Sequence, residues 1–194
     1  MFVTGDRADS VYLVKSGLAR TSLASKNGEL MMQLYVPGQI FGELCFCSRT
    51  RRESAAAVES SEIIEIPLTD LVEQLRRTPE SALDFIVALT EQLAASNERL
   101  HSLAFESAME RLCRTLLLLT ETLGEESPDG IHITRYIHQE QLAQLVAARR
   151  EVVSGLLNRL RERGLIRYPR KGQISVHKVQ LQEYLKSLRE SPDD

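Results

Sequence analysis

The chain has 194 residues, of which 43% are hydrophobic and 26% charged, a balance that is typical of a globular protein and excludes wholesale disorder. No apolar run approaches the roughly 18 residues of a membrane-spanning helix, and Asp6, Arg7 and Asp9 stand where a signal peptide would need an apolar core. Its three cysteines are too few for a disulfide framework and odd in number, so we expect a cytoplasmic protein with one large domain or two small ones.

Charge is distributed unevenly along the sequence. The segment from Arg135 to Lys178 holds ten lysines and arginines against three acidic residues, a local charge of +7. Because the whole chain carries −3, the remainder sums to −10. A basic segment joined to an acidic body indicates a polyanionic partner for that segment. The alternative is a basic face that is merely solvated.

The first 68 residues have the pattern of β structure. Short apolar runs at 11–14, 30–36 and 63–66 predict strands. The pairs Asn27-Gly28 and Pro37-Gly38 separate these runs and favour turns. Short strands at such intervals predict a small antiparallel roll or sandwich.

From Leu68 onward the pattern is helical, and Pro79 is placed to begin a long helix. A narrow stripe of residues then recurs at alternating steps of three and four, which is a heptad pattern with charged flanks. This seam consists of Leu83, Ile86, Thr90, Leu93, Asn97 and Leu100. It indicates either a helix packed on its own β domain or, as we favour, a parallel dimer in which Asn97 pairs with its symmetry mate. A break is expected at 105–107, where Ser107 can cap a second helix.

The segment 139–158 has the apolar pattern of a helix-turn-helix motif. Ala143 is small, as is needed where the two helices cross. Ala147 stands where glycine is usual, because the turn requires a positive φ. The second helix is predicted from about Arg149 to Arg163 and has one apolar face at helical spacing.

The other face of this second helix suits double-stranded DNA. Arginine can bind guanine O6 and N7 together, and glutamate can accept a hydrogen bond from cytosine N4. Residues near the helix N-terminus reach base edges best, so we assign base reading to Arg150 and Glu151. Phosphate contacts are assigned to His138, Arg149, Ser154, Asn158, Arg170 and Lys171. The alternative is an ordinary amphipathic helix with a salt-bridged surface.

The flanking segments predict a winged helix. Two strands are expected at 165–168 and 173–176, with a basic tip at 169–172, and a short helix at 181–188. The polar segment 124–130 is expected to be a linker. No nucleophile–base pair, metal-ligand cluster or phosphate-binding loop is apparent, so we expect neither an enzyme nor a metal site.

Several stretches of the sequence resemble the CRP/FNR family (cyclic-AMP receptor protein / fumarate-nitrate reduction regulator). They are GDRADSVYLVKSGLAR (5–20), PGQIFGEL (37–44), ESAAAVESSEIIEIP (53–67), LAF (103–105) and RREVVSGLLNRLRERGLI (149–166). The resemblance implies an α+β chain with a cyclic-nucleotide-binding-type β-roll at 1–78, a dimerisation helix at 79–106 and a winged helix-turn-helix domain at 107–194.

The resemblance also implies a function. A homodimeric transcription regulator of this family binds a palindromic operator with TGTGA-like half-sites and works with RNA polymerase. The family often has a second base-reading arginine at the position of Gly155, so we expect one specificity contact to be absent.

The effector site implied by the family is altered in this chain. Gly42 and Glu43 match the start of the cyclic-nucleotide cassette, but Glu53 precedes Ser54 where an arginine should hold the phosphate. Arg51 or Arg52 would serve if the loop were shorter. Ser96 and Asn97 lie where the dimer helix would meet a purine.

A cassette retained as scaffold is therefore favoured over cyclic-nucleotide binding, and the three cysteines disfavour an iron–sulfur cluster. The remaining alternative is a ligand- or thiol-sensing module, with Cys45 and Cys47, that does not recognise DNA sequence.

Overall fold

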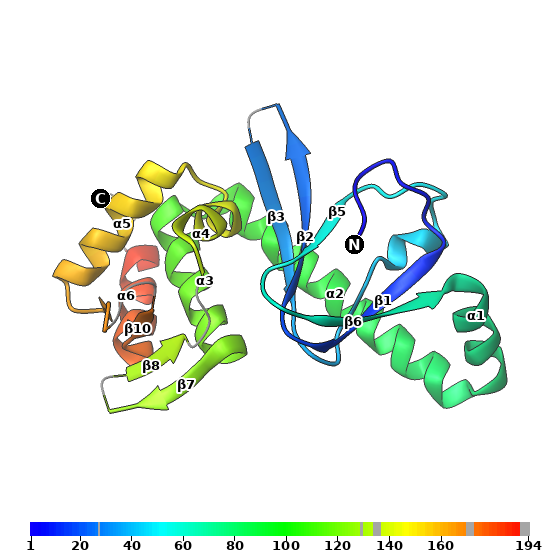
Figure 1. The fold of residues 1–194 in the computed structure, drawn as a ribbon. Helices are drawn as coiled ribbons and strands as arrows, with labels where there is room; N and C mark the ends of the chain where they lie inside the picture. Colours follow the sequence, from blue (N-terminus) through cyan, green and yellow to red (C-terminus); the bar gives the residue numbers. More distant parts are fainter. Residues whose placement is uncertain (27, 129, 134–136, 170–172, 191–194) are drawn as a thin grey trace. The chain divides into compact units, whose positions relative to one another are not determined.

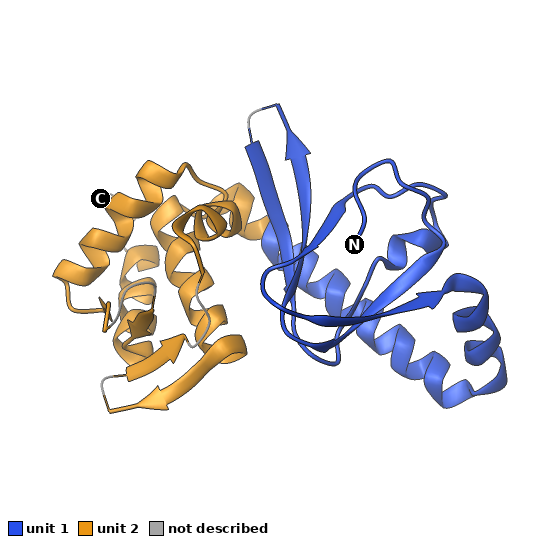
Figure 2. Ribbon diagram, in the orientation of Figure 1, with its two compact units in different colours: residues 1–100 blue, residues 101–194 orange. Residues whose placement is uncertain are grey.

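The computed structural model describes residues 1–26, 28–128, 130–133, 137–169 and 173–190. The chain divides into two compact units, Met1–Leu100 and His101–Asp194 (Figure 2). The first unit joins a β-rich part to the helices that follow it, and the second unit is mainly α, which confirms the expected α+β class (Figure 1). Among the described residues, no helix is both long and apolar enough to cross a membrane.

The β part of the first unit contains two three-stranded antiparallel sheets. Their orders are β4-β1-β6 and β3-β2-β5. The strands are β1 (Ser10–Ser16), β2 (Ala19–Ser25), β3 (Gly28–Tyr35), β4 (Ile40–Phe41), β5 (Ser54–Ala57) and β6 (Glu62–Pro67). The three strands expected from apolar runs are present as β1, β3 and β6, whereas β2, β4 and β5 were not predicted.

Aromatic rings form the core of this β-roll. Tyr12 on β1 stacks on Phe41 of the neighbouring β4, with ring centroids 5.3 Å apart. Tyr35 of the other sheet approaches Phe41 to 5.2 Å, and Phe2 approaches Tyr12 to 5.4 Å. Burial of these large apolar surfaces joins the two sheets and holds the N-terminal residues against them.

Three helices follow the β-roll: α1 (Leu68–Arg77), α2 (Pro79–Phe105) and α3 (Ala108–Leu123). The expected break between α2 and α3 is confirmed. Ser107 caps α3 by accepting a hydrogen bond from the backbone N–H of Glu110, while the Glu110 carboxylate accepts one from the Ser107 N–H.

The remaining elements of the second unit are β7 (Gly124–Ser127), β8 (Gly130–Ile133), α4 (Gln139–Val146), α5 (Arg150–Glu162), β9 (Ile166–Arg167), β10 (Ile174–Val176) and α6 (Lys178–Glu190). The strands form one antiparallel sheet in the order β7-β8-β10-β9. The prediction of a linker at 124–130 is wrong, because Gly124–Ser127 pairs along its length with β8. Its polar side chains gave no strand pattern; the pairing is made by the backbone, and buried Ile133 anchors β8.

The core of the second unit lies between α3, α4 and α5. Leu112 and Leu116 of α3, Leu142 of α4, and Val153 and Leu160 of α5 are all at most 1% exposed. These residues recur at helical spacing on each element. Their burial fixes the face that α5 turns outward.

Candidate nucleic-acid interface

The turn between α4 and α5 has the conformation that the helix-turn-helix pattern requires. Ala147 has φ 55° and ψ 49°, and it has the only positive φ among the described non-glycine residues. The Ala148 N–H donates to the Ala143 carbonyl at 3.1 Å, which closes the turn. Ala143 is buried, as expected for the position where the helices cross.

Replacing Ala147 by glycine should therefore stabilise the protein. A left-handed conformation costs an L-residue about 1–2 kcal/mol, and the extra freedom of glycine in the unfolded chain offsets about half of that. We expect Ala147→Gly to raise the free energy of unfolding by about 0.5–1 kcal/mol in urea titrations. Ala148→Gly is the control, because its φ is not positive; it should lower stability, and a change of the same sign in both variants would contradict the assignment of strain.

Arg111 on α3 holds this turn in place. Its guanidinium donates to the carbonyls of Val146 at 2.8 Å and Ala147 at 3.4 Å, and also to the carbonyl of Glu106 at 2.6 Å. These carbonyls lie at the C-terminal end of α4 and in the break before α3, where no helical partner is available. Sequence reasoning missed this role, because a single arginine in an amphipathic helix indicates no particular contact.

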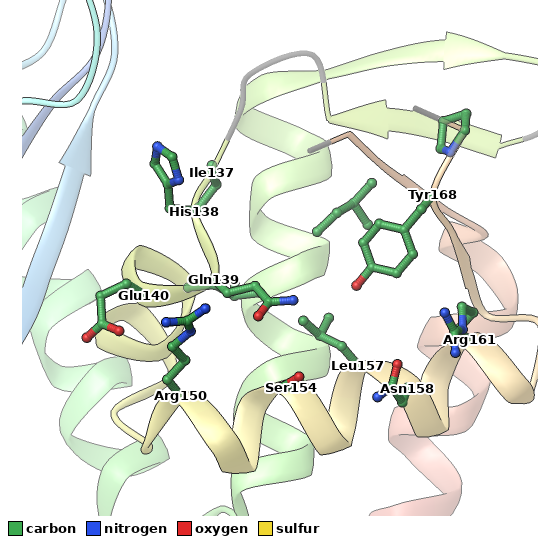
Figure 3. A pocket seen from close by; sticks show the side chains of 13 residues that line it. Ile137, His138, Gln139, Glu140, Arg150, Ser154, Leu157, Asn158, Arg161 and Tyr168 are labelled. Atoms are coloured by element: carbon green, nitrogen blue, oxygen red, sulfur yellow. The ribbon is translucent and has the colours of Figure 1, made fainter. Parts of the chain in front are cut away.

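The outward side of α5 borders a hollow of about 790 Å³ between the start of α4, α5 and the end of β9. Figure 3 shows Arg150, Ser154, Asn158 and Arg161 in a row along α5. The hollow is lined by Ile137, His138, Gln139, Glu140, Leu142, Arg150, Ser154, Leu157, Asn158, Arg161, Tyr168, Pro169 and Ile174.

The hollow brings together four of the assigned DNA-contact residues: His138, Arg150, Ser154 and Asn158. Arg149 is the N-cap of α5, and Glu151 lies in its first turn; both are exposed but do not line the hollow. Arg170 and Lys171 lie outside the described residues.

Gly155 leaves the middle of α5 open. A Cβ atom added there would meet no atom within 4 Å outside the helix's own backbone. This glycine therefore does not serve close packing, and the surface at this point of the helix carries no group that could contact a base.

The altered cassette of the first unit gives Arg51 structural partners. Its guanidinium donates to the carbonyls of Gly42 at 2.9 Å and Ser10 at 2.7 Å, and it lies 4.2 Å from the centre of the Phe2 ring. The residue is 5% exposed. Arg52 is exposed, and the Ser54 hydroxyl accepts a hydrogen bond from the Thr4 N–H.

Two carboxyl groups accompany this arginine. Burial raises the pKa of Glu43 above its usual value. Burial, and then repulsion by Glu43, raise the pKa of Glu53 to about 7. The adjoining cavity, lined by Gly42, Arg51 and Glu53 among others, has a volume of about 10 Å³, which is room for about one water molecule. Ser96 and Asn97 are exposed on α2.

The cysteines differ in environment. Cys47 is exposed and Cys45 is buried. Cys113 is buried in the core of the second unit, and burial raises its pKa to about 12. Its thiol therefore stays protonated, and unreactive, at neutral pH. The described residues contain no group of three His, Cys, Asp or Glu side chains placed to hold a metal ion.

Comparison with known proteins assigns both units to families. Residues 1–78 match the cyclic nucleotide-binding domain, and residues 110–182 match the Crp-like helix-turn-helix domain. The chain is 32% identical over 187 residues to the cyclic AMP receptor protein of Thermus thermophilus, covering 94% of this chain and 82% of the relative. It is 28% identical over 181 residues to the anaerobic regulatory protein of Bacillus subtilis, covering 92% of this chain and 76% of the relative.

Solved structures agree with these matches. A CRP-family transcriptional regulator from T. thermophilus superposes with a TM-score of 0.83 at 22% identity, covering 96% of this chain and 92% of the other. A CRP/FNR-family regulator from the same organism gives a TM-score of 0.76 at 26% identity, covering 95% and 96%. The relatives are regulators of transcription and not enzymes. With its cyclic nucleotide-binding fold, its strained helix-turn-helix and its arginine-led outward face, the chain belongs to the CRP/FNR family of transcription regulators.

Proposed function

We propose that the protein is a cytoplasmic homodimer that binds a palindromic operator with TGTGA-like half-sites. Residues 1–78 would form the effector-type domain, 79–106 the dimerisation helix and 107–194 the DNA-binding domain, with RNA polymerase as the partner in transcription. The observation that carries the proposal is the outward row of α5, which begins with exposed Arg150 and borders an open hollow. An α-helix with such a face fits the major groove of DNA.

The residues of this interface have two kinds of role in the proposal. Arg150 binds guanine and Glu151 accepts from cytosine, because both lie in the first turn of α5. Arg149, Ser154, Asn158 and His138 hold phosphates and fix the position of the helix. Arg170 and Lys171 are assigned to the same task on sequence grounds alone. In a dimer, two such helices enter successive major grooves about 34 Å apart.

Substitution of Arg150 tests the proposal. Arg150→Ala should remove about 1–3 kcal/mol of discrimination at one G·C pair of each half-site while dimerisation is unchanged. The measurement is fluorescence anisotropy with a duplex of two inverted TGTGA half-sites and with variants changed at each base pair.

Arg159→Ala is the matched control, because Arg159 is exposed on the same helix but does not line the hollow. Equal loss on every duplex would make Arg150 a phosphate contact. If the affinity of the wild-type protein for DNA depends neither on the base sequence nor on the salt concentration, a sensing module without sequence recognition is favoured instead.

We further propose that the cassette of this chain is a scaffold and does not hold a cyclic nucleotide. Two arginines line this cavity: Arg51 uses Nη1 and Nη2 for backbone carbonyls and keeps a buried Nε without a hydrogen-bond partner among the described residues, and Arg52 is exposed. Against them, Glu53 brings a carboxyl group to the same cavity, whose volume is only about 10 Å³. The carboxyl group and the small volume both oppose a cyclic phosphate at this place. The same operator titrations repeated with cyclic AMP should give unchanged affinity, and a rise in affinity would contradict the scaffold role.

A further inference from the structure

The hollow beside α5 has two ends of different character. Arg150 and Glu140 lie together at one end, whereas Arg161 and Tyr168 lie at the other (Figure 3). The DNA contacts assigned from the helix-turn-helix pattern include neither Arg161 nor Tyr168. Glu140 lies at the other end of the hollow from Arg161 (Figure 3). An anion bound beside Arg161 would therefore be attracted by the guanidinium and not repelled at close range by the Glu140 carboxylate.

Arg161 differs from its neighbouring arginines in what it faces. Arg163 lies over the Tyr184 ring at 4.9 Å, and Arg159 does not line the hollow. Arg161 is exposed and lines the hollow, and no hydrogen bond or ion pair among residues 137–169 and 173–190 engages its guanidinium. Its donors are available to a molecule that enters from outside.

Tyr168 supplies a second donor at the same end. Figure 3 shows its ring over the hollow, with the hydroxyl pointing into it. Burial raises the pKa of Tyr168 above its usual value, and the nearby Arg161 charge offsets this only in part. The phenol is therefore protonated at neutral pH and can donate to an anionic oxygen.

The spacing along α5 indicates which part of DNA this end would meet. Arg161 follows Arg150 by eleven residues, which is about 16 Å along a helix. The major groove is about 12 Å wide. If Arg150 touches base edges inside the groove, Arg161 lies too far along the helix to reach the same bases, and the phosphates that border the groove are the anions nearest to it.

We propose that Arg161 and Tyr168 form a seat for a DNA backbone phosphate at the C-terminal end of the recognition helix. The proposal rests on the DNA-binding function proposed above. The seat adds a sequence-independent contact on the helix that lacks a base-contacting side chain at Gly155.

A pair of charge-matched variants tests the seat. Arg161→Gln and Arg159→Gln each remove one positive charge from an exposed position two residues apart. Affinity is measured by anisotropy at several salt concentrations, with the inverted TGTGA duplex and with an unrelated duplex of equal length. Arg161→Gln should lower affinity for both duplexes several-fold and reduce the slope of log affinity against log salt by about 1. Arg159→Gln should change the slope by less than half as much.

Tyr168→Phe completes the test, because it removes only the hydroxyl group. It should lower affinity for both duplexes and leave the salt slope unchanged. Circular dichroism and thermal unfolding establish that the three variants are folded.

Three results would overturn the seat: equal effects of the two arginine substitutions, no effect of Arg161→Gln, or a change in base preference with Arg161→Gln. Failure of the function itself has a different signature, namely wild-type binding with no preference for the TGTGA duplex. In that case the salt slopes on the unrelated duplex still decide whether Arg161 contacts phosphate.

Discussion

Replacing Glu106 by glutamine is expected to lower the free energy of unfolding of the second unit by about 3 kcal/mol. The Glu106 side chain is 4% exposed and lies in the break between α2 and α3. Both of its oxygens accept from Nε of Arg114 at 3.1 Å, and Oε1 accepts from Arg189 of α6 at 2.8 Å. The Ser102 hydroxyl donates to the same carboxylate.

The size of this loss follows from the environment of the ion cluster. Breaking a buried ion pair costs about 3–5 kcal/mol. The lower value applies because the side chains of Arg114 and Arg189 are 43% and 49% exposed, so water can reach them once the carboxylate is gone. Glutamine has nearly the same shape, so the change removes charge without opening a cavity.

The same carboxylate makes stability depend on acid pH. Burial alone would raise its pKa, but hydrogen bonds from Arg114, Ser102 and Arg189 outweigh that effect and lower the pKa to about 2. Because the folded-state pKa lies below the unfolded value of 4.5, the stabilisation is complete above about pH 5 and is lost as the pH falls toward 2. The difference in unfolding free energy between wild type and Glu106→Gln should therefore shrink across that window in urea titrations.

Glu121→Gln is the control for both measurements. Glu121 pairs with Lys178 at 3.0 Å, but its side chain is 57% exposed, so the loss should be under about 1 kcal/mol. Equal losses in the two variants, or a Glu106 effect that is the same at pH 3 and pH 7, would contradict the buried cluster.

The helix-turn-helix and the break at Ser107 could be predicted because local chemistry determines both. Crossing helices demand a small residue at Ala143, and the turn demands a positive φ at Ala147, whichever residue stands there. A serine three residues before a glutamate is a helix start. The strands β1, β3 and β6 could also be predicted, because each contains an apolar run.

Strands β2, β5 and β7 were not predicted because their side chains are small or polar and show little alternation. Each is a strand because its backbone pairs with a neighbour: β2 with β3 and β5, and β7 with β8. The pairing of β2 with β5 joins segments that are distant in sequence, whereas β2–β3 and β7–β8 are local hairpins in which β2 and β7 carry no apolar run. Contacts between distant segments are not encoded in any one stretch of sequence. For the same reason, the sequence alone does not reveal the hydrogen-bond partners of Arg51. It also does not reveal the contact between Glu106 and Arg189, which are 83 residues apart in sequence.

The outward stripe of α2 is the surface on which the proposed homodimer depends. Its apolar members are at least 57% exposed in the single chain, namely Leu83, Ile86, Leu93 and Leu100. Other residues of the same helix hold the β-roll: Gln92 donates to the Ile40 carbonyl and Arg99 to the Met31 carbonyl, both at 2.8 Å. This exposure supports the proposed homodimer over packing of the seam on its own β domain.

Leu93→Glu is expected to produce a monomer, because it places a charge in the centre of that stripe. Affinity for a duplex with two inverted half-sites should fall by about 100-fold or more, since the second half-site is then no longer bound intramolecularly. Affinity for a single half-site should stay unchanged. Sedimentation velocity and anisotropy measure the two effects. Val179→Glu is the control, because Val179 is 67% exposed on α6, outside the seam; a Leu93→Glu protein that remains dimeric would place the interface elsewhere.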